Sequence, residues 1–103
     1  MTLSSKERAA LRAEAHHLDP LVHVGHHGLS ATLLGSLDDA LRTRELVKVQ
    51  LGRPVEEKPR AIAERLARET GAVVVQVIGR TATLYRENPD LERKRGDQPP
   101  WRR

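Results

Sequence analysis

The 103-residue chain contains no cysteine and only two aromatic residues, Tyr85 and Trp101. Without cysteine there can be no disulfide bond and no cysteine-based zinc site, which fits a reducing compartment. The scarcity of aromatic rings argues against a surface that stacks several nucleic-acid bases on exposed rings. We therefore expect a core built from Leu, Val, Ile and Ala.

Long apolar runs are also missing. No stretch reaches the 18 or more apolar residues that a membrane-spanning helix requires, and the charged residues 1–18 lack the apolar segment of a signal peptide. We therefore expect a cytoplasmic protein with no membrane partner. The length predicts a single domain with a modest core, too small for a deep, closed active site.

The chain has more basic than acidic residues, with a formal net charge of +4. Such a balance favours polyanionic partners, nucleic acid first, although many soluble domains carry positive charge on a solvated face. Charge alone leaves both interpretations open.

Apolar spacing and end signals predict three helices. Ser4 and Glu7 have the spacing of a capping box, and Pro20 stops the helix that follows. Ser30 can cap the second helix, Pro59 suits the first turn of the third, and Gly71 suits its end. The predicted helices span residues 5–17, 31–44 and 59–70.

Four strands are predicted between and after these helices, over residues 21–24, 46–51, 73–79 and 81–87. Gly79-Arg80 has the length and composition of a two-residue hairpin loop, so the last two strands should be antiparallel. Residues 73–79 are apolar at most positions, which predicts a central strand. The order α-β-α-β-α-β-β predicts an α/β domain with a mixed four-stranded sheet, its helices largely on one face and polar residues on the other: Lys48, Gln50 and Gln76.

The regular pattern ends near residue 88. We expect a folded domain over residues 1–87 and a basic tail, disordered on its own, over residues 88–103, where three prolines and mixed charges replace any apolar period.

The segment Gly25-His26-His27-Gly28 joins the first predicted strand to the second predicted helix. Amides at a helix N-terminus point outward without internal partners, and glycines let a ligand approach the backbone, so this loop can hold a phosphate. It lacks the glycine and lysine spacing of nucleoside-triphosphate and dinucleotide loops. An ordinary turn is the alternative interpretation.

Five histidines fall within residues 16–27, which raises a metal site as an alternative. Adjacent histidines on a helix diverge, however, and no His-Glu-x-x-His pair occurs. Ser30 is better explained as a helix cap than as a nucleophile, and no spacing indicates a Ser-His-Asp set or an acid–base pair of carboxylates. We therefore expect no enzyme activity, no small-molecule substrate and neither a metal nor another cofactor.

Other basic residues would matter for a polyanion only if they share one surface. Two lie on one face of the first predicted helix, one on the polar face of the second strand, one at the hairpin tip and one at the end of the last strand: Arg8, Arg12, Lys48, Arg80 and Arg86.

Three blocks of the sequence together resemble a known family, the YhbY-type CRM domain (chloroplast RNA splicing and ribosome maturation). They are LRAEAHHLDPLVHVGHHGLS, ALRTRELVKVQL and LARETGAVVVQVIGRTATLYR, and the resemblance covers about residues 3–86. It implies a fold similar to the C-terminal domain of translation initiation factor three. It also implies an RNA-binding protein that acts on ribosomal RNA in precursors of the large subunit. We expect the protein to be a monomer.

The resemblance further implies that the loop from Gly25 to Gly28 contacts the RNA backbone, as the Gly-x-x-Gly loop of KH domains does. Many family members carry a lysine or another polar residue there, whereas this chain has His26 and His27, which carry little charge at neutral pH at the ordinary histidine pKa of about 6.5. The alternatives are an adaptor that docks on the ribosome through protein contacts and a histidine-cluster metal-binding protein.

Overall fold

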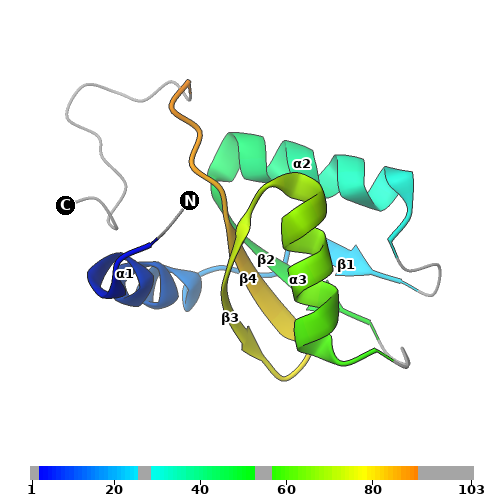
Figure 1. Cartoon of the computed structure of the whole chain (residues 1–103), viewed down its shortest axis with the longest axis horizontal. Coiled ribbons are helices and arrows are strands. Elements are labelled where there is room, and N and C mark those ends of the chain that lie inside the picture. The colour runs from blue at the N-terminus through cyan, green and yellow to red at the C-terminus, as the bar shows by residue number, and fades with distance from the viewer. Residues whose placement is uncertain (1–2, 26–28, 53–56, 91–103) are drawn as a thin grey trace.

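The computed structural model describes residues 3–25, 29–52 and 57–90. Its elements follow the predicted order and form one mixed sheet with three helices, which confirms the predicted fold class (Figure 1). None of the helices in these ranges is long and apolar enough to cross a membrane. The elements are α1 (Ser5–Ala15), β1 (Val22–Val24), α2 (Ala31–Arg44), β2 (Leu46–Leu51), α3 (Pro59–Thr70), β3 (Val73–Ile78) and β4 (Thr81–Tyr85).

The strands lie in the order β1-β2-β4-β3. β1 pairs in parallel with β2, and β4 runs antiparallel to both of its neighbours, so the predicted hairpin between β3 and β4 is confirmed. The prediction that residues 73–79 form a central strand is wrong, because β4 inserts between β2 and β3 and leaves β3 at the edge. β3 is apolar on both sides because helices cover both: Val74 and Val77 pack on one face, Val73 and Val75 on the other.

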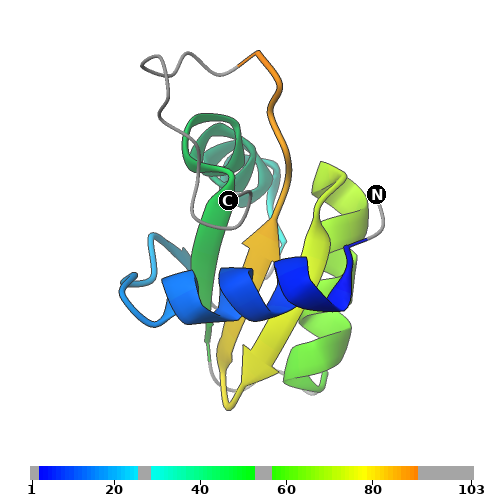
Figure 2. The same ribbon diagram turned by 90° about the vertical axis from the view of Figure 1, so that its left-hand side faces the viewer.

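The core is divided between the two faces of the sheet. α2 and α3 cover one face, where Leu37, Leu41 and Leu66 pack against Val49 and Leu84. On the other face, α1 places Leu11 and Ala15 against Leu46, Val75 and Tyr85. Helices therefore lie mainly on one face, as expected, but α1 crosses the opposite face as a single bar (Figure 2).

Local signals set the helix ends. Ser4 and Glu7 form the predicted capping box, and the Ser30 hydroxyl accepts the Leu33 amide at 3.1 Å. α1 ends at Ala15, slightly before the predicted end, because the chain tightens into a turn in which the Leu18 amide donates to Ala15.

After α2, the buried Glu45 adopts a positive φ of 65°. Its carboxylate accepts the amide of Asn88 at 2.7 Å. The fold's contacts thus extend to the first predicted tail residue, while the prediction of disorder beyond residue 90 lies outside the described ranges.

Candidate nucleic-acid interface

Three segments meet at one end of the sheet: the end of β1, which leads to the glycine–histidine loop, the end of β2 and the β3–β4 hairpin. A Cβ atom added to Gly52 would lie 2.2 Å from the carbonyl oxygen of Val24, so the backbones after β1 and β2 are in close contact. Gly25 follows directly, and a Cβ atom added to it would meet no atom within 4 Å. The chain is therefore held firmly at the point where it enters the loop, whose residues 26–28 lie outside the described ranges.

Arg80, which the sequence places at the hairpin tip, reinforces this end. Its guanidinium donates to the carbonyl oxygens of Leu51 and Gly52, with Nε at 3.3 and 3.1 Å, and its own carbonyl accepts the Leu51 amide at 2.7 Å. A second guanidinium nitrogen also donates to Gly52. Arg80 thus ties the hairpin to the end of β2, next to the point where the chain leaves β1, and an RNA contact by its remaining donors stays a prediction.

The half of the sheet nearest this end is left open by α1 (Figure 2). Strand register places Lys48, Thr83 and Gln76 side by side in one row across β2, β4 and β3. The next row toward the loop contains Gln50, Thr81 and Ile78. We call these six residues the open sheet face.

One side of α1 borders the open sheet face. Arg8 donates to the carbonyl oxygen of Val74 on β3 at 3.0 Å, and His16 lines a hollow together with residues of the open sheet face. Arg12 is exposed and lies one helical turn from each of them, so it shares their side of α1. Three of the predicted site residues, Arg8, Arg12 and Lys48, therefore gather around one surface.

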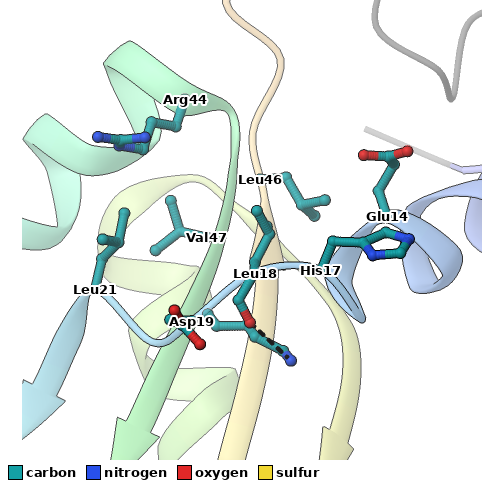
Figure 3. A pocket seen from close by; sticks show the side chains of 9 residues that line it. Glu14, His17, Leu18, Asp19, Leu21, Arg44, Leu46 and Val47 are labelled. Carbon is teal, nitrogen blue, oxygen red and sulfur yellow. Dashed lines mark hydrogen bonds between the residues drawn. The ribbon is translucent and has the colours of Figure 1, made fainter.

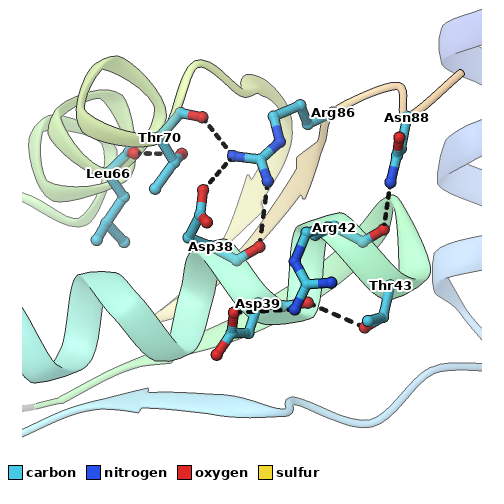
Figure 4. Close-up of polar contacts among 8 residues, drawn as sticks. All are labelled: Asp38, Asp39, Arg42, Thr43, Leu66, Thr70, Arg86 and Asn88. Carbon is cyan, nitrogen blue, oxygen red and sulfur yellow. Dashed lines mark hydrogen bonds and ion pairs between the residues drawn. The ribbon is translucent and has the colours of Figure 1, made fainter. Parts of the chain in front are cut away.

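Arg86 lies at the opposite end of β4 from the loop. Its guanidinium donates to the Asp38 carboxylate and to the Thr70 carbonyl, both at 2.6 Å, and to the Asp38 carbonyl at 3.1 Å (Figure 4). It therefore joins β4 to α2 and α3, and only 21% of its side chain is exposed. RNA binding by Arg86 stays a prediction, but its observed contacts are those of a structural clamp.

Replacing Arg86 with methionine should lower the free energy of unfolding by about 1–2 kcal/mol, because three hydrogen bonds, one of them to a carboxylate, are lost while the apolar stem is kept. Arg42→Met is the matched control, since the Arg42–Asp39 pair is largely exposed and should contribute less than about 0.5 kcal/mol. Urea unfolding followed by circular dichroism measures both. An RNA affinity that falls further for Arg86→Met than for Arg42→Met, with both proteins folded, would support an RNA contact by Arg86 instead.

A larger cavity, of about 520 Å³, lies between the end of α1, the segment leading to β1 and the end of α2 (Figure 3). Lys48 forms part of its wall and donates to the Leu18 carbonyl at 3.2 Å. Acidic and basic side chains both line it, so it presents no single charge: Glu14, His17, Asp19 and Arg44.

Within the described ranges, no three His, Asp or Glu side chains lie close enough together to hold a metal ion. His26 and His27 lie outside those ranges.

The sequence drew attention to Lys48, Gln50 and Gln76 as a polar face but did not identify the rest of the surface. Thr81 and Thr83 are ordinary strand residues by sequence, and His16 appeared only as part of a histidine cluster. Strict alternation along residues 81–85 is the signal that assigns both threonines to one face. The part of the sheet that stays uncovered depends on where α1 crosses it, and the alternation of residues along a strand does not indicate that position.

Comparisons with known proteins give a consistent result. The sequence matches the CRS1 / YhbY (CRM) domain over residues 3–86. It is 36% identical over 88 residues to the "Probable RNA-binding protein YqeI" of Bacillus subtilis, covering 85% of this chain and 92% of that protein. It is 38% identical over 91 residues to an "RNA-binding protein" of Haemophilus influenzae, covering 88% and 92%. The solution structure of SAV1595 from Staphylococcus aureus superposes with a TM-score of 0.75 at 33% identity, covering 88% of this chain and 95% of that one.

Proposed function

Because the chain belongs to the CRS1 / YhbY (CRM) domain family, we propose that it binds RNA and catalyses no reaction on it. The names of its relatives in Bacillus subtilis and Haemophilus influenzae support the RNA partner. The observation that carries the proposal is the gathering of Arg8, Arg12 and Lys48 around the open sheet face, at the side of the molecule that leads to the glycine–histidine loop.

The proposed mechanism is docking on the RNA backbone. Loop amides between Gly25 and Ser30, at the N-terminus of α2, donate hydrogen bonds to a phosphate, and the basic side chains attract the polyanion over a longer range. Arg80 contributes by holding the hairpin and the end of β2 in place beside the loop. Phosphate contacts of this kind set position and affinity more than they read sequence.

The proposed target is ribosomal RNA in precursors of the large subunit, in the cytoplasm, and this finer assignment rests on the family resemblance. The deciding experiment is ultraviolet crosslinking of the purified full chain to naked large-subunit ribosomal RNA, with small-subunit ribosomal RNA as the comparison. We expect crosslinks to the naked large-subunit RNA. Association with ribosomal particles but no crosslink to naked RNA would support an adaptor that acts through protein contacts and would overturn direct RNA binding.

The loop itself can be tested at Gly25. A side chain added there meets open space, so Gly25→Leu should leave the thermal midpoint of unfolding nearly unchanged. If a phosphate approaches the loop backbone closely, the added bulk should lower RNA affinity by about tenfold, measured by fluorescence anisotropy. A folded Gly25→Leu protein that binds RNA like the parent would show that the loop is only a turn.

A further inference from the structure

The open sheet face contains a hollow of about 180 Å³. It is lined by the residue that caps the C-terminal end of α1 and by all three strands that form the face: His16, Lys48, Gln76, Ile78, Thr81 and Thr83. This volume is below the roughly 300–1,000 Å³ typical of clefts for drug-sized ligands. A hollow of this size suits one small planar group better than a complete cofactor.

Thr83 is the most informative residue in the hollow. The residue is only 1% exposed, yet within residues 3–25, 29–52 and 57–90 its hydroxyl has no hydrogen-bond partner. Buried polar groups are nearly always paired, because leaving one unpaired is unfavourable. The Thr83 hydroxyl lines the hollow, so it can form a hydrogen bond with a group that enters the hollow from outside the protein.

The hollow also combines apolar and polar surface in the way that a nucleobase requires. Ile78 is 62% exposed and offers an apolar surface against which a base can lie. Gln76 beside it carries an amide that both donates and accepts hydrogen bonds, which matches the edge of a base. Lys48 uses one of its donors on the Leu18 carbonyl, which leaves others for a phosphate.

We propose that the open sheet face binds one unpaired RNA nucleotide, with its base in the hollow between Gln76, Ile78 and Thr83 and its phosphate beside Lys48. The proposal rests on the proposed RNA-binding function and deepens it. It adds contact with a base to the proposed docking on the RNA backbone. The preferred partner is then an RNA that has an unpaired nucleotide next to the segment bound by the loop. The base lies against an aliphatic side chain here, so the contact does not depend on aromatic rings.

The test compares the full chain with two variants that change the hollow. The probe is a fluorescein-labelled oligouridylate too short to pair, and a blunt RNA duplex of similar length is the second probe. Ile78→Ala removes exposed apolar surface, and Thr83→Val removes the hydroxyl while keeping the shape. Leu21→Ala is the matched control, because Leu21 is the other large exposed apolar residue of the described ranges, 50% exposed, and lies outside the hollow.

We expect Ile78→Ala and Thr83→Val each to weaken oligouridylate binding by roughly five- to tenfold, with little change for the duplex or for Leu21→Ala. Thr83→Val should also keep or raise the thermal midpoint, because it removes an unpaired buried hydroxyl. If Thr83 served only to stabilise the fold, Thr83→Val would instead lower the thermal midpoint and leave the RNA affinity unchanged. That result would overturn the proposal.

The other outcomes separate this inference from the function on which it rests. Parent-like oligouridylate binding by both variants, with RNA binding by the chain intact, would overturn the nucleotide site alone. A parent chain that binds neither probe and does not crosslink to naked large-subunit ribosomal RNA would overturn both proposals. A photoreactive benzoylphenylalanine at position 78 that crosslinks in cells to protein and never to RNA would assign the open sheet face to a protein partner, against the proposal.

Discussion

Replacing Gly52 with alanine should lower the free energy of unfolding by about 1–3 kcal/mol. The added Cβ would lie 2.2 Å from the Val24 carbonyl oxygen, and a backbone atom in a paired strand cannot yield as a flexible side chain would. The ends of β1 and β2 would have to separate, which displaces Gly25 and loosens the Arg80 contacts to Leu51 and Gly52. RNA affinity should therefore fall together with stability.

Gly35→Ala is the control, because it makes the same chemical change but should raise the free energy of unfolding instead of lowering it. Gly35 lies in the exposed middle of α2 with nothing within 4 Å of an added Cβ, so alanine should raise the free energy of unfolding by roughly 0.5–1 kcal/mol. Urea titration followed by circular dichroism measures both variants. Equal stabilities for Gly52→Ala and the parent would refute the close approach of the two strand ends and, with it, the rigid entry to the loop.

The sequence predicted best those features that are set by residues close together in the chain. The capping box at Ser4 and Glu7, the cap at Ser30, the helix end at Gly71 and the hairpin at Gly79-Arg80 are all local, and each is found. The position of β3 in the sheet is not local. Its apolar residues indicate that both faces of the strand are covered. This is true of β3 at the edge of the sheet, as it would be of a central strand.

The same limit applies to the charged residues. By sequence, Arg80 and Arg86 are two similar basic residues at the two ends of one strand. In the fold, Arg80 holds the loop end and Arg86 joins the opposite end to α2 and α3, because their neighbours come from distant parts of the chain. The helical spacing of Arg8, Arg12 and His16 placed them on one side of α1, but only the path of α1 across the sheet brings that side next to Lys48.

Because Arg12 and Lys48 lie at one surface, the RNA affinity and its dependence on salt should change most when charge is removed from that surface. The double variant Arg12→Gln with Lys48→Gln should reduce affinity for large-subunit ribosomal RNA by about 10- to 100-fold at low salt. It should also flatten the plot of log affinity against log salt by about two units, one for each phosphate contact removed. Fluorescence anisotropy over a series of potassium chloride concentrations gives both quantities. Circular dichroism confirms that the loss of the Lys48 bond to Leu18 leaves the protein folded.

The matched control removes the same charge from the other side of the sheet. Arg60 and Arg68 lie exposed on α3, which packs on the face opposite α1, so Arg60→Gln with Arg68→Gln lowers the net charge equally without touching the open sheet face. Long-range attraction alone predicts equal losses for the two double variants, because it depends on total charge. A phosphate path beside Arg12 and Lys48 predicts that the control loses no more than about threefold and keeps its slope. Equal losses in affinity and slope would therefore contradict an RNA path across this surface, even if the chain binds RNA.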